Sequence, residues 1–309
     1  MLKSIVEKCL KESPCDPAAR YGEPLSKHST FKVGGNADCY LRPRGEGFPD
    51  FAAALFKAAH CEGVRVFVLG GGSNTVFSDS GFRGIVLDTG GWSGTEAESD
   101  LLHVRCGTAA NAASKAALVA GLSGLEFLAG MPGSIGGAVR MNAGCFGSEV
   151  SAVLQETEGL DPDGGDGQRF CLAADISKFG YRKSPFQNRQ VLLLNAVFRL
   201  APGNANSIAA KMQANRNDRK EKGHYRFPSA GSVFKNNPSF AMPTGKIIDS
   251  LGLCGTRVGG AQVAPWHGNI IINTGGATAA DIKTLCEEIA AKVKAAKGFE
   301  LEPEILFVS

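Results

Sequence analysis

The feature that most constrains this chain is a glycine-rich stretch at residues 121–144, which reads GLSGLEFLAGMPGSIGGAVRMNAG. Glycine allows positive φ angles and lets another group approach the main chain closely, and runs of N–H groups in such a loop form a concave site for an anion. The stretch also contains large apolar residues, so we expect it to pack into a core rather than to act as a flexible linker; these are Leu125, Phe127, Leu128, Ile135 and Val139. Taken alone, the pattern also fits a cluster of tight turns inside a large domain.

A second glycine cluster follows an apolar run at residues 64–74, which read VRVFVLGGGSN. The pattern predicts a strand that enters a phosphate-wrapping loop, and two such loops suggest a large ligand such as a dinucleotide. The next predicted element, at residues 84–88, is a strand, whereas a Rossmann motif requires a helix there. Gly245 and Lys246 lack the flanking residues of a Walker A motif.

The composition is that of a globular protein from a reducing compartment. The 309 residues suffice for two domains, the formal net charge is +3, and 43% of the residues are hydrophobic. The chain has no basic tract, so we expect no nucleic-acid partner. Nine scattered cysteines without CxxC spacing argue against disulfides or a zinc site, and we predict no metal. The first 16 residues predict an amphipathic helix rather than a signal peptide. No later stretch is long and apolar enough to span a bilayer, so we expect a cytoplasmic protein with no membrane partner.

The hydrophobic periodicity predicts a mixture of helices and strands. After the opening helix, helices are expected at 48–60, 109–120, 207–222, 245–251 and 279–294, the last with Thr278 and Asp281 at its start. Strands are expected at 28–38 (ending in a turn), 39–43, 84–88, 101–106, 151–160, 191–200 and 269–273 and at the C-terminus, with a polar turn at 161–168.

Three segments in the second half carry residue types suited to chemistry. The hydroxyl of Ser232, presented after Gly231, is suited to proton donation, but no nucleophile-elbow pattern surrounds it and a serine in a turn is common. Arg182 follows Tyr181 and is suited to clamping a carboxylate, although a surface arginine is the more common case. On a strand, alternation would place three glutamates on one face, as functional carboxylates or as a charged sheet edge; these are Glu300, Glu302 and Glu304.

Taken together, the segments resemble the UDP-N-acetylenolpyruvoylglucosamine reductase (MurB) family. The matching pieces occur in the family's order, cover most of the chain and are specific as a set. They are STFKVGGNAD, VLGGGSNTVFSDSGFRGIVL, GLEFLAGMPGSIGGAVRMNAGCFG, GYRKSPFQ, PSAGSVFKNN, GGAQVAPWHGNIIINTGGATAADI and GFELEPEI.

The resemblance implies an α+β fold. Residues 34–200 would form an FAD-binding domain of the vanillyl-alcohol-oxidase (PCMH) type, and a helix and strand from residues 1–33 would pack on it. Residues 201–309, beyond a boundary at Ala201–Ala205, would form a C-terminal α+β substrate-binding domain. The FAD would be bound non-covalently, with its pyrophosphate held by Gly70, Gly71, Gly72, Ser73 and Asn74 and by Gly130, Pro132, Gly133, Ser134, Gly136, Gly137 and Ala138.

The resemblance also implies the reaction, which is the NADPH-dependent reduction of UDP-N-acetylglucosamine enolpyruvate to UDP-N-acetylmuramate in peptidoglycan precursor synthesis. NADPH reduces the flavin, a hydride then passes to the terminal carbon of the enolpyruvyl group, and a proton reaches the neighbouring carbon. The family motifs would place the proton donor at Ser232 and the stabilisation of the carboxylate and enolate at Arg182 and Glu304. The implied substrate contacts are Tyr181, Lys220, Lys235, Asn236 and His267, with Lys235 also a candidate cation beside the Ser232 hydroxyl.

Two details differ from the usual family pattern. Asn236-Asn237-Pro238 has one residue more than the usual Asn-Pro, and the chain before GYRKSPFQ is too short for the substrate-closing loop of one branch. The chain therefore resembles the shorter, loop-lacking type, and we predict a monomer that binds a UDP-sugar and NADPH. Two alternatives stay open. One is an oxygen-using oxidase of the same fold with covalently attached flavin, and the other is a non-catalytic nucleotide-binding module.

Overall fold

The computed structural model describes residues 1–162 and 168–309 and divides into two compact units, each assembled from several stretches of chain. Unit 1 comprises Met1–Gly22, Asp38–Gly71 and Gly84–Asn217, and unit 2 comprises Glu23–Ala37, Gly72–Arg83 and Asp218–Ser309. The polar turn predicted at 161–168 lies largely outside the described residues. The domain boundaries expected from the sequence stay a prediction.

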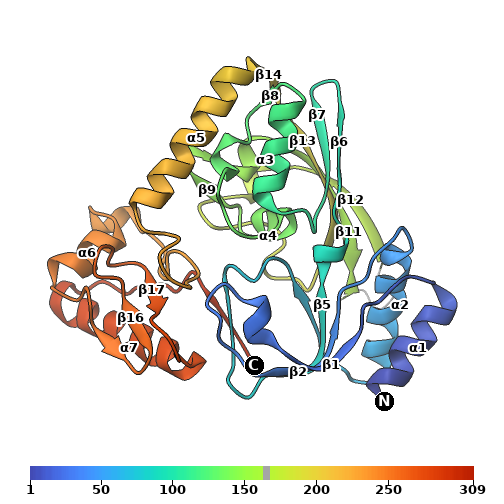
Figure 1. The fold of residues 1–309 in the computed structure, drawn as a ribbon, viewed down its shortest axis with the longest axis horizontal. Coiled ribbons are helices and arrows are strands. Elements are labelled where there is room, and N and C mark those ends of the chain that lie inside the picture. Colours follow the sequence, from blue (N-terminus) through green and yellow to red (C-terminus); the bar gives the residue numbers. More distant parts are fainter. Residues whose placement is uncertain (163–167) are drawn as a thin grey trace. The chain divides into compact units, whose positions relative to one another are not determined.

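Most of a four-stranded sheet belongs to unit 1. Its order is β1 (Arg20–Pro24), β2 (Asn36–Leu41), β5 (Phe82–Asp88) and β3 (Val66–Leu69), and β3 runs parallel to β5. Helices α1 (Leu2–Glu12) and α2 (Phe48–Cys61) lie side by side (Figure 1). Their apolar faces and those of β2 and β5 share one core, because residues such as Ile5, Phe51 and Leu87 are buried in the same cluster.

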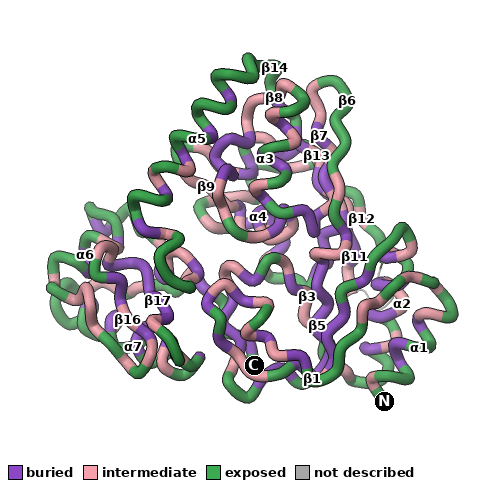
Figure 2. The backbone as a smooth tube through the Cα atoms, viewed as in Figure 1, coloured by how far each residue is buried: buried purple, intermediate pink, exposed green. Residues whose placement is uncertain are grey.

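A five-stranded antiparallel sheet forms the second layer of unit 1. Its order is β12 (Gln168–Ala173), β11 (Leu154–Asp161), β13 (Leu192–Arg199), β7 (Leu101–Arg105) and β6 (Thr95–Glu98). Side chains of a strand alternate between faces, so Leu192 and Leu194 of β13 join the first core whereas Leu193 enters a second one. The second core holds helices α3 (Ala110–Val119) and α4 (Ile135–Arg140) and the apolar residues of the glycine-rich stretch, as predicted (Figure 2).

Short elements complete unit 1. Strand β8 (Leu122–Ser123) pairs with β14 (Ala201–Pro202), and β9 (Gly144–Cys145) pairs with β10 (Ser148–Glu149). Helix α5 (Ala205–Glu221) begins in unit 1 and ends in unit 2. The short 3₁₀ helices of unit 1 are Thr89–Gly91, Glu126–Leu128, Val150–Ala152 and Ile176–Lys178.

Unit 2 packs two helices on short strands around its own core. These elements are α6 (Thr244–Ser250), α7 (Ala279–Lys297), the antiparallel strands β15 (Arg257–Val258), β16 (Ala261–Val263) and β17 (Ile271–Asn273), and the parallel pair β4 (Thr75–Phe77) and β18 (Leu306–Val308). Two 3₁₀ helices span Leu25–His28 and Pro238–Phe240. Thr278 and Asp281 form a capping box at the start of α7, so the predicted helix start is confirmed.

One predicted strand is wrong, and the predicted C-terminal strand is present as β18 but does not contain the three glutamates. Residues 28–35 form no strand, because the Ser29 Oγ accepts a hydrogen bond from the Phe31 N–H and Lys32 adopts a φ of +59°; such a local turn competes with strand pairing. The three glutamates do not share a strand either, since β18 begins only at Leu306. Glu300 instead pairs with Lys294, and Glu302 pairs with Lys235.

Candidate active site

The two glycine clusters meet in unit 1 through bare main chain. A Cβ atom on Gly71 would lie 2.5 Å from the Cα of Gly133, and one on Gly70 would lie 2.5 Å from the Oγ of Ser134. Real Cβ atoms do not approach other atoms so closely, so only glycine fits at position 71, where the atoms met are main chain, whereas at position 70 the Ser134 hydroxyl would have to move. Two turns that are distant in the sequence thus pack against each other, and we call this pair of turns the cradle and define it as Gly70, Gly71, Gly133 and Ser134.

The 130–138 loop is fixed to the segment that follows β7. The N–H groups of Ile135 and Gly136 donate to the carbonyls of Thr108 (2.8 Å) and Cys106 (2.7 Å), and the Ala110 N–H donates to the Gly133 carbonyl (3.0 Å). Gly133 adopts a φ of +112°, which an L-residue rarely does. Three main-chain hydrogen bonds therefore fix the loop to the segment between β7 and α3.

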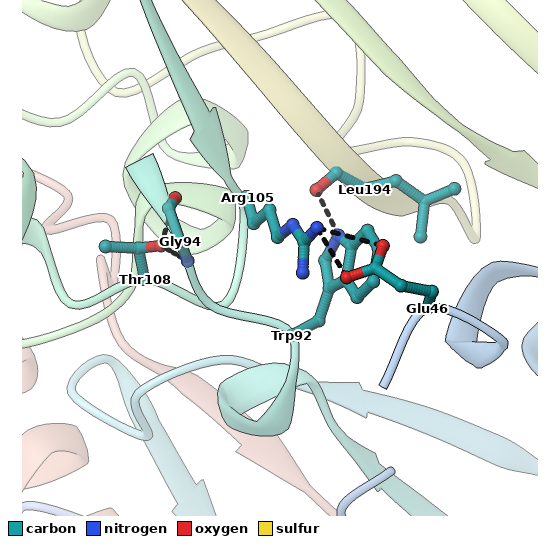
Figure 3. Close-up of polar contacts among 6 residues, drawn as sticks. All are labelled: Glu46, Trp92, Gly94, Arg105, Thr108 and Leu194. Atoms are coloured by element: carbon teal, nitrogen blue, oxygen red, sulfur yellow. Dashed lines mark hydrogen bonds and ion pairs between the residues drawn. The ribbon is translucent and has the colours of Figure 1, made fainter. Parts of the chain in front are cut away.

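Side chains clamp the segment on which this loop is mounted (Figure 3). The Thr108 hydroxyl accepts from the Gly94 N–H (2.9 Å) and donates to the Gly94 carbonyl (3.1 Å). Next to it, the guanidinium carbon of Arg105 lies 4.0 Å from the centre of the Trp92 ring, and the Arg105 Nη2 donates to both carboxylate oxygens of Glu46 (2.8 and 2.9 Å). The stacked and ion-paired Arg105 thus connects the loop before α2 with strand β7 of the second sheet.

Several amides of the predicted FAD site already have partners in the protein. The Gly136, Gly137 and Ala138 N–H groups donate to Cys106, to the Ser134 Oγ (3.3 Å) and to the Ser134 carbonyl, and the Gly130 N–H donates to Asn111. Pro132 has no N–H group. The prediction that backbone amides bind a pyrophosphate therefore rests on the cradle, where the main chains of the two turns face each other.

The remaining residues of the GGGSN motif belong to unit 2, where they support Glu304. The Gly72 carbonyl accepts from the Thr30 N–H (3.0 Å). The Asn74 side-chain amide donates to the Glu304 carbonyl (2.9 Å), and the Asn74 carbonyl accepts from the Leu306 N–H (2.8 Å). Asn74, predicted only as a cofactor contact, thus fixes the main chain of a predicted catalytic residue.

Unit 2 brings Ser232 and Glu304 onto adjacent segments. Ser232 forms an antiparallel bridge with Ile270, and two residues later Phe234 forms one with Pro303. The Glu304 N–H donates to the Val233 carbonyl (2.7 Å). Ser232 and Glu304 are both half-buried. The main chains of Ser232 and Glu304 are therefore held on neighbouring segments of unit 2.

The predicted substrate contacts of unit 2 differ in their charge and in their hydrogen-bond partners. The Lys235 Nζ lies 2.5 Å from the Glu302 Oε1, so its charge is neutralised there. The Asn236 Oδ1 accepts from the Thr244 N–H at the start of α6 (2.9 Å). Lys220 is exposed near the end of α5. Burial lowers the pKa of His267, so this ring is neutral at neutral pH, and its Nδ1 accepts from the Asn269 N–H (3.1 Å).

Arg182 and Tyr181 belong to unit 1, where Arg182 contacts the end of the glycine-rich stretch. The Arg182 Nη1 donates to the Gly144 carbonyl (3.0 Å), and its guanidinium carbon lies 5.2 Å from the centre of the Tyr181 ring. Arg182 has a φ of +55°. Sequence reasoning missed the residues that hold this segment, Arg140 and Asn142, because no local periodicity marks a hydrogen bond to a distant carbonyl.

Comparison with known proteins identifies the class and then the family. Residues 49–165 match the model of an FAD binding domain, and residues 223–308 match that of the UDP-N-acetylenolpyruvoylglucosamine reductase C-terminal domain. The fold and the match to the FAD binding domain thus define an α+β FAD-binding protein. The UDP-N-acetylenolpyruvoylglucosamine reductase of Borrelia garinii subsp. bavariensis is 39% identical over 92% of this chain and 91% of its own. That of Caldanaerobacter subterraneus subsp. tengcongensis is 37% identical over 100% and 99%.

A solved structure agrees with these relatives. The crystal structure of UDP-N-acetylenolpyruvylglucosamine reductase (MurB) from Thermus caldophilus matches with a TM-score of 0.78 and 29% identity, over 96% of this chain and all of that one. This chain belongs to the UDP-N-acetylenolpyruvoylglucosamine reductase family. The predicted family and the predicted fold class are confirmed. In the described ranges we find neither a helix that is long and apolar enough to cross a membrane nor a cluster of potential metal ligands.

Proposed function

We propose that this chain uses FAD and NADPH to reduce UDP-N-acetylglucosamine enolpyruvate to UDP-N-acetylmuramate. Family membership over nine-tenths of the chain supports the substrate class. One observation in the structure carries the chemistry: Ser232 and Glu304 come from distant parts of the sequence and lie on adjacent, main-chain-bonded segments. We further propose that the protein is a cytoplasmic monomer, which light scattering of the holoprotein and cell fractionation would test.

The cradle fits the pyrophosphate of FAD. Because Gly70 and Gly71 carry no Cβ atom, the two turns can pack directly against each other, and the exposed Gly71 presents main chain that an anion can approach. Gly70, Gly71, Gly133 and Ser134 would hold that group, and the remaining residues of the two motifs would shape the turns. When bound, FAD supplies the hydride, which originates from NADPH.

Arg182 would grip the substrate carboxylate. A guanidinium has five N–H donors in a planar fork, and the Arg182 Nη1 donates to the Gly144 carbonyl. A fork of this kind binds a carboxylate through two parallel hydrogen bonds. As the hydride reaches the terminal carbon, negative charge develops on the neighbouring carbon and its carboxylate, where a fixed cation stabilises the transition state most.

Ser232 would donate the proton that completes the reduction. The hydride and this proton add across the carbon–carbon double bond, and Ser232 then regains a proton from solvent. Glu304 would hold the carboxylate end of the substrate through a shared proton or hydrogen bond, as the family motif implies. The half-buried position of both residues strengthens these interactions, because the effective dielectric constant is lower there than in water.

The other predicted contacts would bind the UDP-sugar. Lys220 and Lys235 would contribute positive charge, while Asn236, Tyr181 and the neutral His267 would form hydrogen bonds to the sugar or to the phosphates. Lys235 has to share its charge with Glu302, so we assign it to substrate binding and keep its assistance to Ser232 as a secondary proposal.

The substitution Ser232→Ala tests the proposal. Reduction of the bound flavin by NADPH should proceed at the wild-type rate, whereas reoxidation by the enolpyruvyl substrate should slow by about 10²–10⁴-fold, the usual contribution of a positioned acid. Ser250→Ala, in α6, is the matched control because the Ser250 Oγ donates only to the Ile247 carbonyl one turn away. Equal reoxidation rates in both variants would exclude Ser232 as the donor. Yellow colour that stays on acid-precipitated wild-type protein would favour the oxidase alternative.

A further inference from the structure

Arg182 has a backbone conformation that it would not adopt without restraint. Its φ of +55° lies in the left-handed region, which costs a residue with a Cβ atom about 1–2 kcal/mol. Such conformations persist only where the surrounding structure holds them, and they concentrate at functional sites. The groups that hold the 180–189 segment are therefore of interest for the position of the Arg182 guanidinium.

Arg140 holds the segment after Arg182. It is the last residue of α4, and its guanidinium donates to the main-chain carbonyls of Phe186 (2.6 Å), Gln187 (3.1 Å) and Arg189 (3.2 Å). In return, the Ser184 hydroxyl donates to the Arg140 carbonyl (2.6 Å). Burial lowers the pKa of Arg140, because its guanidinium is partly removed from water, and the three carbonyls supply hydrogen-bond acceptors in place of that water. Lysine has no planar fork with which to reach several carbonyls at once.

Asn142 holds the segment before Arg182. Its side chain is fully buried, its Nδ2 donates to the Gly180 carbonyl (2.9 Å), and its Oδ1 accepts from the Ser151 N–H (2.9 Å). Asn142 itself adopts a φ of +42°. Two residues later in the chain lies Gly144, whose carbonyl receives the Arg182 side chain. Asn142 thus connects the backbone on which Arg182 sits with the backbone to which its guanidinium binds.

A third bond acts on Arg182 directly. The Gln187 Nε2 donates to the Arg182 carbonyl (2.9 Å), and the Gln187 carbonyl is one of the three that Arg140 holds. The 180–189 segment is thereby tied at Gly180, at Arg182 itself and at the three carbonyls from Phe186 to Arg189. Every one of these tethers starts from the glycine-rich stretch or from a residue bound to it.

We propose that Arg140 and Asn142 are positioning residues, which hold Arg182 in its left-handed conformation and so aim its guanidinium at the substrate carboxylate. This inference rests on the proposed function of Arg182. It assigns the end of the glycine-rich stretch a second task besides cofactor binding. The residues of this stretch up to Ser134 shape the cradle, and those from Arg140 to Gly144 carry the catalytic arginine.

The test measures the two half-reactions separately in Arg140→Lys, Arg140→Met and Asn142→Asp. Asn142→Asp keeps the shape and the acceptor for Ser151 but removes the donor to Gly180, so it keeps the test valid if an Arg140 variant does not fold. We expect flavin reduction by NADPH and FAD content at wild-type levels, and reoxidation by the enolpyruvyl substrate slower by about 10²-fold, since a displacement of about 1 Å has that effect on a reacting group. Arg199→Met, which breaks a surface ion pair with Asp100, is the matched control.

Combination with Arg182→Ala separates positioning from a general structural role. If Arg140 and Asn142 act through Arg182, their substitution should cause no further loss of reoxidation rate in the Arg182→Ala protein. A further loss of the same 10²-fold, or an equal slowing of both half-reactions in the single variants, would overturn the positioning role and leave the proposed function standing. Wild-type reoxidation in Arg182→Ala alone would overturn both.

Discussion

The substitution Gly71→Ala tests the cradle most directly. The added Cβ would lie 2.5 Å from the Gly133 Cα, 2.8 Å from the Gly133 carbonyl carbon and 3.0 Å from the Ser134 nitrogen, and all three are main-chain atoms. Ordinary contacts begin at 3.4 Å, so the two turns have to separate by close to 0.9 Å. Overpacking of this kind costs about 1–3 kcal/mol. If the cradle binds the FAD pyrophosphate, the dissociation constant should rise about 5- to 150-fold.

The assay is dilution of the holoprotein with fluorescence detection of the released flavin. Gly180→Ala is the control, because a Cβ there would meet nothing closer than the Lys183 Cβ at 3.9 Å, and Gly180 has no positive φ. We expect Gly180→Ala to retain flavin as the wild type does. Flavin retention by Gly71→Ala that equals the control, in a protein whose melting temperature has fallen, would show that the two turns pack together without holding the cofactor.

Three further predictions concern the support of the site and the stability of unit 2. Asn74→Ala removes the donor to the Glu304 carbonyl. This substitution should slow flavin reoxidation by the substrate more than flavin reduction by NADPH, which rapid-mixing absorbance traces would measure. Equal slowing of both half-reactions would limit Asn74 to cofactor binding. Burial, with the charges of Arg219, His267 and Lys222, lowers the pKa of His224 to about 4. The unfolded state therefore binds more protons than the folded state between about pH 6.5 and pH 4. As the pH falls through that window, the free energy of unfolding should decrease by about 1 kcal/mol after allowance for solvent screening. Urea unfolding of His224→Gln should lack this part of the pH dependence. Thr278→Ala removes the N-cap of α7 and should lower the free energy of unfolding by about 1 kcal/mol, with an unchanged unfolding midpoint as the contrary result.

Local patterns in the sequence predicted most of the regular structure. The helices expected at 48–60, 109–120, 207–222, 245–251 and 279–294 are present to within three residues at each end. Each has an apolar face or a capping signal that acts within a few residues. The strand that enters the GGGSN loop was predicted for the same reason, since an apolar run ends there in glycines.

The errors arose where a distant residue decides the local structure. The apolar residues Phe31 and Val33 suggested a strand, yet they fill the core of unit 2 from a turn fixed by Ser29. Alternation suggested that the three glutamates lie on one face of a strand, whereas two of them form ion pairs with Lys294 and Lys235. Periodicity reports on one element at a time and contains no information about such partners.

The candidate site was predictable only to the level of residue types. The family motifs named Ser232, Glu304 and Arg182, and the structure adds how each is held. The hydrogen bonds from Arg140 to the Phe186 carbonyl and from Asn74 to the Glu304 carbonyl join residues that are 46 and 230 positions apart. No spacing rule in the sequence reveals such bonds, because they depend on how complete elements pack.

The most direct measurement of the central claim is an anaerobic rapid-mixing experiment on the wild-type holoprotein with two additions. The account predicts that NADPH bleaches the flavin absorbance and that UDP-N-acetylglucosamine enolpyruvate then restores it, with UDP-N-acetylmuramate formed in equal amount to the NADPH consumed. Flavin that NADPH bleaches but only oxygen restores would contradict the account.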